Sequence, residues 1–134
     1  MKDPLVFTTS LSLSYEEALD AVEAALKEEG FGVLTHVDAQ ATFKKKLDED
    51  FRPFSILGVC NPHLAHRLLQ NVPQIGLVLP CKVTVEANDG GSIVRFINPE
   101  MMVALSFDDH PVIPQVAQEA KESILRVLKV LEGR

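Results

Sequence analysis

Two cysteines are the side chains in this sequence best suited to chemistry. Cys60 ends an apolar run and is followed by Asn61 and Pro62, whereas Cys81 begins a later alternating segment. Asparagine followed by proline is typical of a helix start, with asparagine as the N-cap and proline at the first helical position. We therefore expect Cys60 to end a strand and Cys81 to begin another. If those strands pair antiparallel, the two thiols become neighbours.

Three interpretations of these residues stay open. In the first, Cys60, Asn61 and Cys81 form a small-ligand site within the segments Cys60-Asn61-Pro62 and Pro80-Cys81, where free amide groups at the helix start would attract a polar or anionic ligand. In the second, Cys60 is a redox or enzymatic nucleophile whose pKa the helix start lowers, and Cys81 is its resolving partner. In the third, both cysteines are small buried apolar residues and Asn61 is only a cap.

Other candidate chemistry is weaker. His63 and His66 lie three residues apart near Cys60, but a zinc site takes about four ligands and the sequence has no Cys-x-x-Cys pair to add. His36 and His110 are isolated, which is typical of structural or surface histidines. No glycine-rich phosphate loop or serine nucleophile motif is present. We therefore expect no metal and no cofactor, and whether the chain is an enzyme stays open.

Hydrophobic periodicity supplies the elements that would position these residues. Alternation or apolar runs predict five strands, over 5–11, 31–37, 54–60, 81–87 and 92–97. The strand over 54–60 is apolar at odd and at even positions alike, which predicts that both of its faces are covered. Caps and apolar stripes predict five helices, over 15–29, 39–47, a short one after Asn61, one or two turns over 100–105, and a long one from about 113.

The last helix carries more apolar surface than one core face needs. Leu125 and Val130 flank its main apolar stripe on either side. Because exposed apolar surface of this kind marks contact sites, we expect a homo-oligomer, a dimer in the simplest case.

Composition limits the class of protein. The chain has 134 residues, 46% of them hydrophobic, which predicts a single domain over 1–134. Its net charge of −6 argues against nucleic-acid binding, and acidic residues directly follow its lysine run 44–46, which predicts a solvated helix face. No apolar stretch approaches the roughly 18 residues of a membrane span. The segment Met1–Phe7 lacks a signal-like apolar region, so we expect a cytoplasmic protein with no membrane partner.

Two motifs resemble those of the domain-of-unknown-function 302 family. They are FRPFSILGVCNP over 51–62 and IGLVLPCKV over 75–83, followed by the turn Asp89-Gly90-Gly91 and the Asn98-Pro99 step. The resemblance covers nearly the whole chain in order and spacing. It implies an α+β fold similar to the TATA-box-binding-protein-like arrangement, a curved antiparallel sheet with helices packed on one face. It implies no activity, so the function expected from the sequence is no more than a small soluble binding or interaction domain.

Overall fold

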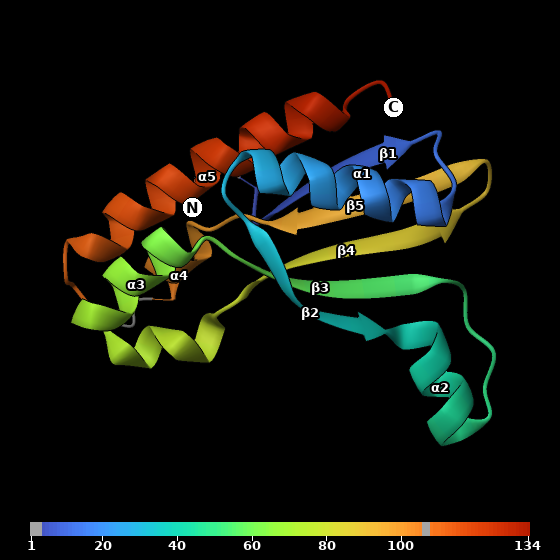
Figure 1. The fold of residues 1–134 in the computed structure, drawn as a ribbon. Coiled ribbons are helices and arrows are strands. Elements are labelled where there is room, and N and C mark those ends of the chain that lie inside the picture. The colour runs from blue at the N-terminus through green and yellow to red at the C-terminus, as the bar shows by residue number, and fades with distance from the viewer. Residues whose placement is uncertain (1–3, 106–107) are drawn as a thin grey trace.

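The computed structural model of the chain describes residues 4–105 and 108–134. Its strands form one five-stranded antiparallel sheet in the order β1-β5-β4-β3-β2 (Figure 1). The strands are β1 (Val6–Leu11), β2 (Gly32–Asp38), β3 (Phe54–Cys60), β4 (Cys81–Asn88) and β5 (Gly91–Ile97). All five predicted strands are confirmed, and β3 has the predicted bounds. Residues 1–3 of the segment used to predict localisation lie outside the described residues.

One antiparallel sheet combined with separate helices confirms the predicted α+β class. Two of them, α1 (Tyr15–Glu28) and α5 (Val112–Leu131), cover the sheet face (Figure 1). Between them and the sheet lies the main core, which includes Val22, Leu26, Val83, Val85, Val94, Phe96, Ile124 and Val127. No helix in the described part of the chain is long and apolar enough to cross a membrane.

The first helix begins and ends where its sequence predicts. The Ser14 hydroxyl accepts a hydrogen bond from the Glu17 amide at 3.2 Å, and the Glu17 carboxylate accepts one from the Ser14 amide at 3.1 Å. This capping box satisfies two amides that the first helical turn leaves without backbone partners. At the other end Gly30 has φ +82°, a left-handed conformation that glycine adopts without a Cβ clash.

The prediction that both faces of β3 are covered is wrong. Ser55, Leu57 and Val59 are buried against the helices, whereas Phe54 and Ile56 on the opposite face are only half-buried. On that face the ring of Phe54 lies 6.1 Å from the Phe51 ring and 5.5 Å from the Arg52 guanidinium, both in the segment before β3.

Three short helices close one end of the sheet. These are α3 (Pro62–Asn71), the 3-10 helix η1 (Pro73–Val78) and α4 (Met101–Ala104). With the first half of α5 they enclose a second apolar cluster that includes Leu68, Val72, Ile75, Met102 and Ile113. The apolar stretch before Pro80 is therefore helical and belongs to this cluster.

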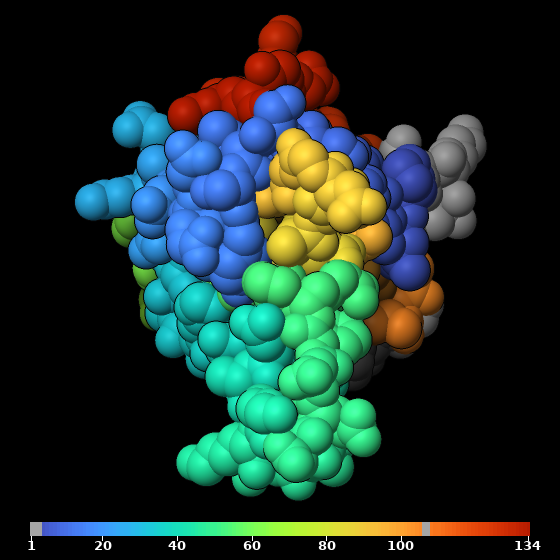
Figure 2. Space-filling view, turned by 90° about the vertical axis from the view of Figure 1, so that its right-hand side faces the viewer, coloured from blue at the N-terminus to red at the C-terminus, as the bar shows by residue number. Residues whose placement is uncertain are grey.

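The remaining helix, α2 (Ala39–Leu47), lies beyond the opposite end of the sheet. The Asp38 carboxylate caps it by accepting a hydrogen bond from the Ala41 amide at 2.9 Å. Figure 2 shows this teal segment projecting from the body of the molecule. Lys44 forms exposed ion pairs with Asp48 at 3.1 Å and with Asp50 at 3.4 Å, so the lysine run occupies a solvated face as predicted.

Candidate functional site

The sheet register brings the two cysteines together. Strands β3 and β4 pair antiparallel with Val59 opposite Cys81, which places Cys60 one residue beyond that pair. Both cysteines are free thiols. The predicted juxtaposition of the end of β3 with the start of β4 is therefore present in the fold.

A pocket opens where these strand ends meet the helices. Residues of the sheet, α3, α4, α5 and the connecting segments line it: Phe31, Val59, Cys60, Asn61, Leu64, Ala65, Leu68, Leu79, Pro80, Cys81, Met102, Val116 and Ala120. Its volume is about 340 Å³ including the open mouth, and about 30 Å³ of this can hold the centre of a water molecule. The walls are apolar apart from Asn61 and the thiols. All three residues selected from the sequence thus line one pocket.

Burial makes both thiols harder to ionise. Burial, with an added contribution from the charge of a Cys60 thiolate, raises the pKa of Cys81 to about 11, although the charge of Lys82 opposes this shift. Burial also raises the pKa of Cys60 above its usual value. The expectation of a lowered Cys60 pKa is therefore wrong, because apolar walls remove the hydration that a thiolate needs.

The helix start beside the thiols is already capped. The side-chain oxygen Oδ1 of Asn61 accepts hydrogen bonds from the amides of His63 at 3.1 Å and Leu64 at 3.3 Å. The expectation of free amide groups there is wrong for these two, because the asparagine side chain occupies them. The side-chain nitrogen Nδ2 of Asn61 lies over Gly30. A Cβ added to Gly30 would be 3.1 Å from this nitrogen. Asn61 thus holds α3 against the end of α1.

One glycine permits the close approach of strands at the pocket. A Cβ added to Gly58 would overlap the Thr35 hydroxyl and lie 2.7 Å from the ring of Pro80. Pro80 itself lines the pocket beside Cys81. The glycine therefore lets the segment before β4 pack directly on β3.

The histidines lie outside this pocket. His63 and His66 are exposed on α3, and the described residues contain no group of three or more His, Cys, Asp or Glu that could hold a metal. The His36 ring nitrogen lies 2.6 Å from the Ser55 hydroxyl. His110 accepts a hydrogen bond from the Val112 amide at 3.0 Å near the start of α5. These last two contacts are structural.

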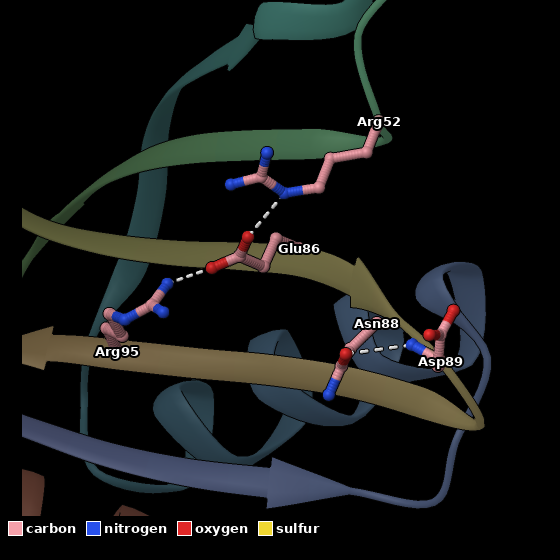
Figure 3. Close-up of polar contacts among 5 residues, drawn as sticks. All are labelled: Arg52, Glu86, Asn88, Asp89 and Arg95. Carbon is pink, nitrogen blue, oxygen red and sulfur yellow. Dashed lines mark hydrogen bonds and ion pairs between the residues drawn. The ribbon is translucent and has the colours of Figure 1, made fainter.

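Sequence reasoning missed two features of the fold. Met102 of α4 lines the pocket, although it lies far from both cysteines in the sequence and its neighbourhood gives no signal of this. The second is an ion-pair cluster on the opposite sheet face, in which Arg52 and Arg95 flank Glu86 (Figure 3). Glu86 lies close to Arg95, and Arg52 Nε is 2.6 Å from its carboxylate.

The arginines of this cluster keep Glu86 ionised. Burial alone would raise the pKa of this carboxyl, but hydrogen bonds from Arg95 and Arg52, together with their charges, lower it below the usual value. The Arg52 guanidinium also lies over the Phe51 ring at 4.7 Å and the Phe54 ring at 5.5 Å. Through the ion pair of Arg52 with Glu86, the segment over 51–54 therefore stabilises the contact between the start of β3 and β4. In the same view the Asn88 side chain accepts a hydrogen bond from the Asp89 amide at 2.8 Å, which orders the hairpin turn.

We expect Glu86→Gln to lower the free energy of unfolding by about 2 kcal/mol at pH 7, because it weakens two charge-assisted hydrogen bonds to a side chain that is 5% exposed. The lowered pKa stabilises the fold above the unfolded value of 4.5, and this contribution is lost as the pH falls through the folded pKa. Urea denaturation at pH 7 and near pH 3 should therefore show a smaller difference between variant and wild type at the lower pH.

Glu119→Gln is the control, because the Arg67–Glu119 pair is exposed on both sides. It should cost less than about 1 kcal/mol. Equal losses for the two variants at pH 7 would contradict a stabilising role for the Glu86 cluster.

Comparison with known proteins identifies relatives over nearly the full length of the chain. A sequence model of the family described as "Domain of unknown function DUF302" matches residues 7–131. The crystal structure of an uncharacterized conserved protein DUF302 from Bacillus stearothermophilus is similar, with 30% sequence identity and a TM-score of 0.85. The similarity covers 97% of this chain and 100% of that one. No curated protein matches.

Proposed function

This chain belongs to the DUF302 family, whose description assigns no activity, and we propose that it is a binding domain whose ligand occupies the pocket between Cys60, Asn61 and Cys81. The observation that carries the proposal is the convergence of these three residues on one mostly apolar pocket. Small-ligand sites are typically concave and apolar with a few polar groups that fix orientation. The TATA-box-binding-protein-like arrangement implied by the resemblance is compatible with this fold and is part of the proposal.

A thiol nucleophile receives less support than a binding site. With the pKa of Cys81 near 11 and that of Cys60 also raised, both thiols are mainly protonated near neutral pH. The thiolate is the nucleophilic form of cysteine. A redox or enzymatic role for Cys60 and Cys81 is therefore the second candidate, supported by their adjacency alone. The free thiols also fit a cytoplasmic location, which we propose on that ground.

We expect small compounds that bind the pocket to raise the melting temperature of the full chain, because a ligand at 100 times its Kd stabilises the folded state by about 2.7 kcal/mol. A fragment screen by NMR and thermal shift would identify such compounds. Ala65→Leu should abolish their binding, because Ala65 lines the pocket and the larger side chain would fill it.

Ala41→Leu is the matched control, since Ala41 is an exposed alanine on the distant α2. It should leave binding unchanged. Fragments that perturb scattered surface residues, or that still bind to Ala65→Leu, would argue against a pocket-centred function.

We also propose that the chain forms a homodimer through α5. Leu125 and Val130 are 42% and 57% exposed on this helix, which supports a contact with a second copy. The double substitution Leu125→Glu and Val130→Glu should convert a dimer to monomer in size-exclusion chromatography with light scattering. Gln115→Glu, an exposed change on the same helix, should not. A wild-type protein that is monomeric at micromolar concentration would rule the dimer out.

A further inference from the structure

The sheet face opposite the main core carries a row of side chains that crosses all five strands. The strand registers place its members opposite one another in the order Thr8, Arg95, Thr84, Ile56 and Val37. None of these five residues is buried, whereas Val83 and Val85, the neighbours of Thr84 in β4, are both buried in the core. We call this side of the sheet the open face. Because adjacent strands lie about 4.8 Å apart, the row extends over roughly 19 Å.

Two arginines on the open face are held side by side by one carboxylate (Figure 3). One oxygen of Glu86 bonds to Arg95 and the other bonds to Arg52, and these arginine side chains are 40% and 50% exposed. In the part of the chain that the structure describes, these are the only hydrogen bonds of the two guanidiniums. A guanidinium has five N–H groups and binds carboxylates in a bidentate manner. Most of these N–H groups are therefore available to acceptors outside the chain.

The charge of the open face is opposite to that of the whole chain. Lys82 lies two residues before Thr84 in β4 and shares its face, so three cations lie near the single carboxylate of Glu86. Arg126, in contrast, has a carboxylate of its own, that of Glu29, at 2.8 Å. Since the chain has a net charge of −6, this local surplus of positive charge is complementary to an acidic partner and not to the rest of the protein.

Apolar side chains on the same face add contact area around the arginines. Val37 is 46% exposed, and Ile56 and Ile93 are half-buried. Protein interfaces typically combine apolar residues and arginine with a polar rim. A small molecule is usually bound in a concave pocket, whereas a row roughly 19 Å long matches an extended segment of a protein.

We propose that the open face docks an acidic segment of a partner protein, with carboxylates of that segment bound by Arg52 and Arg95. The docking surface goes beyond the proposed ligand pocket, because none of its residues lines that pocket. A second copy of this chain fits less well, since a basic face against an acidic surface is a contact between unlike patches and continues into open chains. Nucleic acid is disfavoured by the net charge of −6.

The test is fluorescence anisotropy of a labelled peptide of glutamate and valine, titrated with the full chain at low salt. We expect saturable binding. A matched peptide with glutamine in place of each glutamate should bind at least about 10-fold more weakly, because it loses the hydrogen bonds to charged groups. Arg95→Gln should weaken binding of the acidic peptide by a similar factor. Arg126→Gln, which removes an exposed arginine of α5, should leave it unchanged.

Thr8→Glu covers the case in which Arg95→Gln fails to fold, because Thr8 is exposed and lies opposite Arg95. The added carboxylate repels an acidic segment and should weaken binding by about 10-fold. Gln115→Glu makes the same change in net charge on α5 and should have little effect.

The proposal is overturned if the wild type does not bind the acidic peptide, if the glutamine peptide binds equally well, or if Thr8→Glu and Gln115→Glu weaken binding equally. Tighter binding of duplex DNA than of the peptide would overturn it in favour of a nucleic acid. Self-association that Thr8→Glu abolishes would overturn it in favour of a second copy.

Discussion

Replacing Gly91 by alanine is expected to lower the free energy of unfolding by about 3 kcal/mol, at the upper end of the usual cost of overpacking. A Cβ at this position would overlap the backbone carbonyl oxygen of Leu11 and lie 3.3 Å from the Ser12 Cα. Leu11 is paired with Ser92 in the β1–β5 ladder, so its carbonyl cannot withdraw without disturbing that pairing. For a chain of this length, such a loss lowers the melting temperature by roughly 10 °C.

Gly32→Ala is the matched control for this experiment. Gly32 also lies in a strand, but a Cβ added there meets no atom within 4 Å. Because alanine reduces the freedom of the unfolded chain, this variant should be neutral or more stable by less than about 1 kcal/mol. Thermal and urea denaturation measure the stability of both variants. Equal melting temperatures would contradict the prediction, because they would show that the Leu11 carbonyl can move aside without destabilising the fold.

In the folded protein, Cys81 is expected to react with iodoacetamide about 100-fold more slowly at pH 8 than in the unfolded chain. A pKa raised from 9.0 to about 11 favours the protonated form, so the reactive thiolate falls from roughly 10% to roughly 0.1% of the population at this pH. The rate should rise with pH as the solution approaches the folded pKa. Mass spectrometry of alkylated peptides, with and without urea, measures the ratio.

Cys60 provides an internal comparison in the same experiment. It is less deeply buried, and burial is the one cause that raises its pKa. We therefore expect Cys60 to be alkylated before Cys81. Cys60→Ser should modestly accelerate the reaction of Cys81 only at the higher pH values where the Cys60 thiol is itself ionised, because only then does Cys60 carry a negative charge beside Cys81. Equal rates for Cys81 in folded and unfolded protein would contradict its burial and would restore the thiol nucleophile as the better functional candidate.

Local features of the candidate site follow from the sequence. Asn61 before Pro62 marks the start of α3, and the alternating segment from Cys81 marks β4. These elements form through contacts within a few residues, such as the hydrogen bonds that Oδ1 of Asn61 accepts from the amides of His63 and Leu64. The family motifs likewise indicate a curved antiparallel sheet with helices on one face.

Properties that depend on residues far apart in the chain cannot be predicted from local sequence patterns. Arg52 and Glu86 are neighbours only because β3 and β4 pair, and neither residue's own segment indicates its partner. Met102 reaches the pocket because α4 packs against α5. The covering of β3 on one face alone is a further case, since the apolar pattern of a strand does not identify what lies opposite it.

The sequence by itself determined the five strands and the five α-helices, because hydrophobic period and caps are local, while the family motifs indicated the antiparallel sheet and Cys60, Asn61 and Cys81 were selected as candidates. Only the tertiary structure decided that the thiols are hard to ionise and that the amides of His63 and Leu64 are occupied. It also placed Met102 as a third sulfur residue in the pocket wall. The physical reason is that the desolvation of a thiol and the residues that line a pocket depend on which distant side chains the packing brings together.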